Sequence, residues 1–202
     1  MLIEVNEQKV AQQIIRQGLD DAAKSMEFFT MSETRQEFDE NFVIGKTGPL
    51  NLMSYENKII YLLTTGLEGE LNGKAFLILT EEEVNALMKI RYDSKKTYSQ
   101  TYEARRDGLI LEIDNIITAS VMSQFANHFD YNTYGGTPNL DILTYRGLVD
   151  SFETERTNNE FTLEFKARLV SEGVNINANF VWFVDEKFIN GIKKATYNSA
   201  LV

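Results

Sequence analysis

The chain of 202 residues contains no cysteine, only two prolines and a single histidine. The lack of cysteine excludes disulfides, thiolate nucleophiles and thiolate metal ligands, and it suits the reducing cytoplasm, where we expect this protein. The one histidine, His128, excludes a multi-histidine metal site within one chain. It lies near the end of an expected helix, where the helix dipole favours a cation, so we interpret it as structural. Any catalysis must therefore rest on carboxylates, amides, hydroxyls and bound water.

Positive charge is also scarce, because 20 basic residues stand against 30 acidic ones and give a formal net charge of −10. Like-charge repulsion disfavours nucleic acid as a partner and favours a protein with a basic docking face. The N-terminal residues are too polar for a signal peptide, and no run approaches the ~18 apolar residues of a membrane span. We therefore expect no membrane insertion. The length suits one substantial domain or two small fused halves.

Apolar periodicity in the first half predicts a long helix, a strand, a hairpin and a short helix. Asn72-Gly73 is a dipeptide favoured in tight hairpin turns, where both central residues need positive φ. Thr80 and Glu83 have the spacing of a capping box. The expected elements are a helix over residues 7–31, a polar stretch over 32–41, strands over 42–44, 58–66 and 74–79, and a helix over 81–90.

The second half repeats this order after a polar link over residues 93–101. We expect a helix over 107–128, strands over 145–154, 161–169 and 175–184, and a closing helix that starts at Asp185. The sequence therefore predicts an α+β protein with two α-β-β-β-α halves, at about 5–93 and 102–195, related by a pseudo-two-fold axis. The long helices would pack on an antiparallel sheet.

The most informative residues lie on the second long helix. Glu112 and Asn115 are three residues apart, which places them on one helix face, opposite most of the apolar side. Small residues such as Ala119, Ser123 and Ala126 flank them, with Met122 close by. A carboxylate and a carboxamide side by side can hold a water molecule and present it to an electrophile. Many such pairs are only solvent-facing, so the pair alone does not establish a site.

The wider pattern resembles the CheC/CheX/FliY family of chemotaxis phosphatases over residues 5 to 195. The family signature is Asp or Ser, three residues, Glu, two residues, Asn, 22 residues and Pro. Glu112, Asn115 and Pro138 match it at the correct spacing, whereas glycine stands at position 108 instead of Asp or Ser, and Asp107 lies one residue early. In the first half no intact copy exists, and Gln17 and Asp20 lie roughly where Glu and Asn would fall. The chain thus resembles a member with one site.

The resemblance implies removal of phosphate from the aspartyl phosphate of a CheY-like response regulator. Asn115 would orient the attacking water and Glu112 would contact the regulator. The chain would need no cofactor of its own, because the regulator supplies Mg²⁺ and a cationic group. Phosphoryl transfer depends mainly on positioning and charge stabilisation, so an amide can serve as the catalytic group.

Two other functions stay open at this point. The chain could be a non-catalytic module of the same fold that binds a response regulator or a flagellar-switch partner, which the glycine at position 108 favours. It could also be a small-ligand-binding α+β domain, with Asn175, Asn177 and Asn179 as a polar lining, although a solvent-exposed strand face explains them as well. Self-association is possible, and the sequence does not decide the oligomeric state.

Overall fold

The structure is a computed structural model that describes residues 3–30, 34–38, 42–92, 97–171 and 174–199. The helices are α1 (Val5–Thr30), α2 (Glu81–Arg91), α3 (Tyr102–Phe129), α4 (Tyr145–Asn158) and α5 (Glu186–Ser199), with a short 3-10 helix η1 (Met53–Tyr55). The strands are β1 (Thr34–Phe38), β2 (Val43–Lys46), β3 (Ile60–Gly69), β4 (Gly73–Thr80), β5 (Thr133–Gly135), β6 (Asn139–Leu143), β7 (Phe161–Ser171) and β8 (Val174–Val184).

These eight strands form one antiparallel sheet whose order is symmetric about its centre. The path runs β1-β7-β8-β4-β3-β5, with β2 also paired to β7 and β6 also paired to β3. Each half of the chain therefore places its first two strands beside the hairpin of the other half. The structure confirms the predicted α+β fold class, with long helices on an antiparallel sheet. Each half has four strands instead of the expected three.

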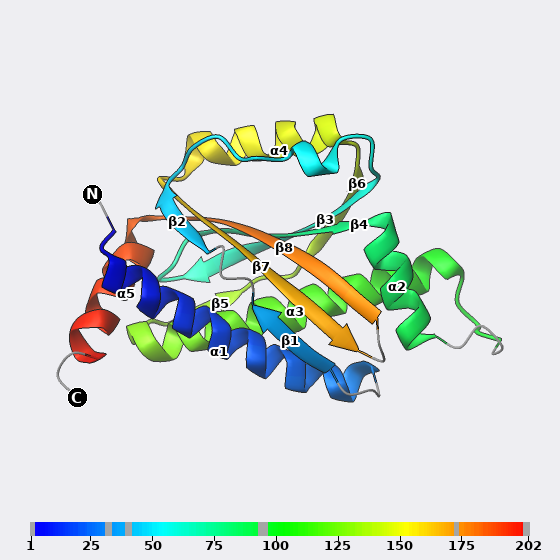
Figure 1. Ribbon diagram of the computed structural model, residues 1–202, viewed down its shortest axis with the longest axis horizontal. Helices are drawn as coiled ribbons and strands as arrows, with labels where there is room; N and C mark the ends of the chain where they lie inside the picture. Colours follow the sequence, from blue (N-terminus) through cyan, green and yellow to red (C-terminus); the bar gives the residue numbers. More distant parts are fainter. Residues whose placement is uncertain (1–2, 31–33, 39–41, 93–96, 172–173, 200–202) are drawn as a thin grey trace.

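The helices cover the two faces of the sheet unequally. In Figure 1, α1 and α3 lie side by side below the sheet, α5 and α2 flank them at opposite ends, and α4 lies above it. The larger core fills the space between the sheet and α1, α3 and α5, and a smaller core lies under α4. Burial of these apolar side chains is the main driving force for the arrangement.

Helix α3 is fixed at both ends. The Thr101 hydroxyl accepts a hydrogen bond from the N–H of Ala104 at 3.2 Å, and the helix ends at Asp130 in the left-handed conformation. The Lys194 ammonium donates to the carbonyl of Phe129 at 2.9 Å, which satisfies one terminal acceptor. By length and composition alone α3 could cross a membrane, but half of its most apolar window is buried inside the protein. This weak signal is what the core helix of a folded domain produces.

The segment over residues 145–154 is helix α4, so the predicted strand is wrong. Its buried side chains are Leu148, Phe152 and Glu155, which follow helical spacing. They cover the outer face of β3 and β4, where Ile60 and Phe76 are buried. The outer face of β8 joins this smaller core at Val181 and Phe183, whereas the outer face of β7 carries polar side chains such as Glu164 and Lys166. The sequence-based interpretation of this region as a strand did not consider that the apolar outer face of β3 and β4 must be buried against another element.

Two further predictions about the first half need correction. Strand β1 lies inside the stretch that was predicted to be merely polar, and it pairs with β7 of the other half. The hairpin between β3 and β4 exists, but Gly73 is already the first residue of β4, and Asn72 is not one of the described non-glycine residues with positive φ. In this hairpin the positive φ angles are at Gly69 (+93°) and Gly73 (+154°). The capping box at Thr80 and Glu83 is confirmed.

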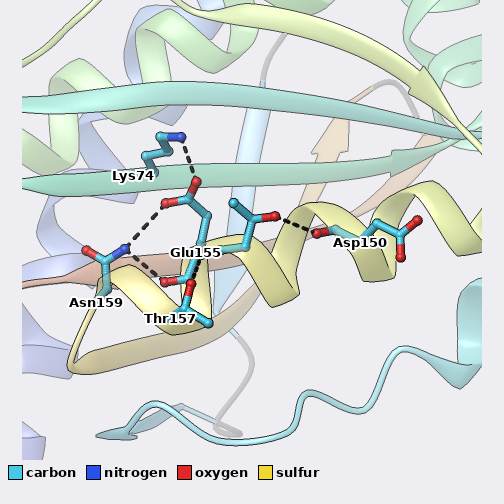
Figure 2. Close-up of polar contacts among 6 residues, drawn as sticks. Lys74, Asp150, Glu155, Thr157 and Asn159 are labelled. Atoms are coloured by element: carbon cyan, nitrogen blue, oxygen red, sulfur yellow. Dashed lines mark hydrogen bonds and ion pairs between the residues drawn. The ribbon is translucent and has the colours of Figure 1, made fainter.

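An ion pair attaches α4 to the sheet. The Lys74 ammonium on β4 lies 2.6 Å from a carboxylate oxygen of Glu155, whose side chain is almost fully buried, and the Asn159 amide donates to the same residue (Figure 2). A buried carboxylate without its cation is costly, although Lys74 itself is half exposed.

We therefore expect Lys74→Met to lower the free energy of unfolding by about 1 to 2 kcal/mol at neutral pH. Urea unfolding measures the change. Lys24→Met is the matched control, since Lys24 and its partner Asp21 are both exposed and such pairs contribute less than about 1 kcal/mol. Equal effects of the two substitutions would contradict a specific role for the Lys74–Glu155 pair.

Candidate functional site

The two sides of α3 differ as the sequence predicted. The apolar side is buried, with Ile113, Ile117 and Phe125 almost inaccessible to solvent, whereas Glu112 and Asn115 are exposed. Met122, expected beside the polar pair, is buried in the core instead. The carboxylate and the carboxamide therefore project from a helix that is held rigidly by its buried side.

Glu112 and Asn115 line an open depression of about 660 Å³. One wall is α3, and the other is the segment that contains β5 and leads into β6. The lining residues are Glu68, Gly108, Leu111, Glu112, Asn115, Tyr134, Gly135, Gly136, Thr137 and Pro138. The structure thus brings Pro138 to the same depression as Glu112 and Asn115. The 22 intervening residues complete α3, turn back and form β5.

Two glycines lie in the second wall, and one of them, Gly135, packs closely against α3. A Cβ atom on Gly135 would be 3.0 Å from the Thr118 methyl carbon on α3, whereas one on Gly136 would be 2.6 Å from Oε1 of Glu68, an end of a flexible side chain that can move aside. The glycines in the sequence between Asn115 and Pro138 are therefore part of the site's shape. Sequence reasoning did not assign them a role.

The charge of the depression is negative. Among the described residues that line it, Glu68 and Glu112 are carboxylates, and lysine and arginine are absent. Within the same described part of the chain, no three His, Asp or Glu side chains are grouped as metal ligands. The two carboxylates favour a ligand or partner that carries positive charge.

A buried carboxyl group lies directly behind the site and was missed in the sequence. Asp114 is 1% exposed, and it accepts a hydrogen bond of 2.6 Å from the Thr65 hydroxyl on β3. Burial raises the pKa of Asp114 to about 6. The hydrogen bond from Thr65 favours the ionised carboxylate and therefore limits this rise. An aspartate among core positions of the helix, with Ile113 before it and Ile117 after it, is the signal that could have revealed it.

The first element of the family signature has no substitute. Position 108 is open, because a Cβ atom there would meet nothing within 4 Å. Asp107 does not line the depression, and its carboxylate instead pairs with the guanidinium of Arg106 at 2.7 Å. The displaced aspartate is thus held by a neighbour, and the space beside Glu112 is empty of side chain.

The counterpart of the site on α1 differs from the sequence-based interpretation. When 99 is added to the residue numbers of α1, its buried positions coincide with the buried positions of α3. Ile14, for example, then coincides with Ile113. It places Gln13 and Arg16, and not Gln17 and Asp20, at the positions of Glu112 and Asn115.

Gln17 is instead hydrogen-bonded to the imidazole of His128 at 2.9 Å across the α1–α3 contact. This bond agrees with the structural role expected for that histidine.

The asparagine face of β8 borders a second hollow, of about 400 Å³, on the other side of the sheet. Asn177 is exposed, while Asn179 is half-buried and lines this hollow with Glu164 and Tyr55. Burial raises the pKa of the Tyr55 phenol, and a hydrogen bond to Asn179 acts against that rise. The side chain of Asn175 lies outside the described residues. A small-ligand site here stays a hypothesis without further support.

Comparison with known proteins identifies the fold. Neither a protein-family model nor a curated protein matches the sequence. Thermotoga maritima FliY matches with a TM-score of 0.75 and 13% identity, over 98% of this chain and 99% of that one. FliM from the FliG–FliM complex of H. pylori matches with a TM-score of 0.65 and 9% identity, over 93% and 100%. A putative chemotaxis protein of Desulfovibrio vulgaris Hildenborough matches with 0.51 and 12%, over 90% and 100%.

These likenesses confirm the CheC/CheX/FliY type of fold that the sequence pattern predicted. They extend over nearly the whole chain and nearly the whole of each matched structure. Identities of 9% to 13% carry the fold alone. The likenesses therefore assign no role to Glu112 and Asn115, and any role for these residues must be inferred from the chemistry of the depression.

Proposed function

We propose that this protein removes phosphate from the aspartyl phosphate of a CheY-like response regulator. The observation that supports it most is the joint position of Glu112, Asn115 and Pro138 at one open depression, with both polar side chains exposed on a rigid helix. A cytoplasmic location suits this partner and belongs to the same proposal.

In this mechanism α3 docks over the phosphorylated aspartate of the receiver domain. The Asn115 amide accepts and donates hydrogen bonds to one water molecule and holds it in line with phosphorus. Glu112 contacts the receiver and fixes the approach of the helix. Because the buried side of α3 holds the helix rigidly, little freedom is lost at the moment of reaction.

The negative charge of the depression restricts the substrate. Glu68 and Glu112 would repel a free phosphate monoester, and no cation of the lining offsets them. A receiver domain brings Mg²⁺ and its own cationic group to the phosphorylated aspartate, as the family resemblance implies. We therefore assign the metal to the receiver and propose that the protein acts only on a phosphate presented together with these charges.

A non-catalytic binding module is the alternative function. The empty position beside Glu112 at Gly108 favours it, because the family signature has a polar side chain there. The fold is also that of FliM, which the solved structure shows in complex with FliG. In this case α3 and the adjoining wall would bind a receiver or a flagellar-switch protein without hydrolysis.

Phosphate decay of a CheY-like receiver from the same organism tests the proposal. The receiver is phosphorylated with a small phosphodonor, and its decay is followed with and without the protein, with binding measured in parallel. We expect faster decay with the receiver and no turnover of p-nitrophenyl phosphate. Binding without faster decay supports the non-catalytic module, and no binding contradicts both functions.

Substitution at position 108 separates the two functions further. We expect Gly108→Ser to raise the decay rate by about 3- to 10-fold over the wild type, because serine restores a polar group beside Glu112 at an unobstructed position. Gly108→Ala is the control, and both substitutions should stabilise the exposed helix by ~0.3 to 1 kcal/mol. If the serine and alanine variants have the same rate, the hydroxyl has no catalytic role.

A further inference from the structure

The backbone around Tyr134 is held on both sides. Strand β5 pairs with the end of β3, where Tyr134 lies opposite Glu68. The Thr133 hydroxyl donates to the carbonyl of Glu68 at 2.9 Å, and the N–H of Gly136 donates to the carbonyl of Gly66 at 2.8 Å. The position of the Tyr134 Cα atom is therefore fixed by neighbours on either side of it.

The Tyr134 side chain, in contrast, is 53% exposed. Large exposed hydrophobic side chains occur at several places in the described chain, and among them Tyr134 is the one that lines the depression with Glu112 and Asn115. Its ring has no aromatic or cation–π partner of the kind that Tyr92 and Phe129 have among the described residues. The ring is thus presented beside the candidate site without an intramolecular contact of that type.

A fixed backbone with an exposed tyrosine suits protein recognition. Tyrosine supplies a large contact area with only two side-chain torsions, so little conformational entropy is lost on binding. Tyrosine and tryptophan are accordingly common among the residues that dominate binding energy at interfaces.

The charges next to the ring define the partner. Glu68 is the cross-strand neighbour of Tyr134, and Glu112 lines the same depression. A partner surface that covers this wall must offer a pocket for the ring and at least one cation for the carboxylates. A receiver domain with Mg²⁺ and a cationic group at its phosphorylated aspartate has this chemistry.

We propose that Tyr134 is the anchor by which the protein binds its receiver domain, and that Glu68 and Glu112 select for the positive charge around the phosphorylated aspartate. The identity of the partner rests on the proposed function, whereas the role of Tyr134 holds for catalysis and for non-catalytic binding alike. Tyr134 acts in binding and has no part in the chemical step.

Affinity for a receiver held in its active state by beryllofluoride and Mg²⁺ provides the test, because this complex does not turn over. We expect Tyr134→Ala to weaken binding by about 10- to 100-fold, the range of an interface anchor. Tyr134→Phe should stay within about 3-fold of the wild type, since it keeps the ring. Tyr197→Ala is the matched control, because Tyr197 is 69% exposed on α5 and does not line the depression.

Three additional measurements separate anchoring from a folding defect and from the chemistry, and test the role of the charges. Urea unfolding should show that Tyr134→Ala has nearly the stability of the wild type, and in the decay assay it should raise KM with kcat within about 2-fold. Added salt should weaken receiver binding less for Glu68→Gln than for the wild type.

Three outcomes would overturn the proposal: an unchanged affinity of Tyr134→Ala, an equal loss in Tyr197→Ala, or no binding of the receiver by the wild type. If the wild type accelerates decay and Tyr134→Ala has the same KM as the wild type, the anchor is refuted and the proposed function stays intact. Tight binding that depends on Tyr134 without any faster decay refutes the proposed catalysis and keeps the anchor.

Discussion

Asn115→Ala is expected to reduce the acceleration of receiver dephosphorylation by about 100-fold or more. Removing one preoriented polar group from a catalytic site commonly costs 10²- to 10³-fold in rate. In the proposed mechanism the carboxamide is the group that places the attacking water, and the sequence offers no cysteine or second histidine to replace it. Since Asn115 is exposed, the free energy of unfolding should change by less than ~0.5 kcal/mol.

Asn127→Ala is the matched control for this experiment. Asn127 is an exposed asparagine on the same helix, and it does not line the depression. It should keep the wild-type rate, whereas Asn115→Gln should lose most of the acceleration because its longer side chain displaces the water. An Asn115→Ala variant that dephosphorylates the receiver at the wild-type rate would falsify the water-orienting role.

Asp114→Asn is expected to stabilise the protein by about 2 to 3 kcal/mol at pH 8 and to have little effect near pH 4. Burial raises the pKa of Asp114 from 3.8 in its ordinary state to about 6 in the folded protein. Each pKa unit corresponds to 1.36 kcal/mol between the two protonation states. Asparagine keeps an acceptor for the Thr65 hydroxyl and removes the buried charge.

The direction of the pH dependence follows from linkage. A carboxyl group with a raised pKa in the folded state favours folding when it is protonated, so its contribution is fully present below about pH 3.8. It is lost as the pH rises through about 6, where the folded protein must ionise a buried group. The wild type should therefore lose stability relative to Asp114→Asn between pH 4 and pH 7.

Urea unfolding of both proteins at pH 4, 5, 6 and 8 measures this difference. Burial also raises the pKa of Glu83 and of Glu164, but these groups are present in both proteins and cancel in the comparison. A constant difference between wild type and variant across this pH range would show that Asp114 has an ordinary pKa.

The sequence by itself determined what depends on local periodicity. The spacing of Ile113 and Ile117 buries one side of α3 and leaves Glu112 and Asn115 exposed, because 3.6 residues per turn decide which side chains share a face. The capping box at Thr80 and Glu83 is equally local, since its hydrogen bonds span three residues. Strand β7 and the first part of β8 were also predictable, because their apolar and polar residues alternate in the sequence.

Tertiary structure decided what depends on partners from elsewhere in the chain. Strand β1 has a polar sequence and exists because β7 supplies its hydrogen bonds, and α4 is a helix that covers an outer face of β3 and β4. The burial pattern, and not residue identity, placed Gln13 and Arg16 at the counterpart of the site on α1.

The candidate site combines both kinds of information. Spacing alone put Glu112 beside Asn115, but their proximity to Pro138 and Tyr134 requires β5 to pair with β3 of the other half of the chain. Burial of Asp114 against Thr65 likewise depends on the contact between α3 and the sheet. The physical reason is that a helix or strand is specified by interactions a few residues apart, whereas a site formed between elements depends on the sheet pairing that joins distant segments.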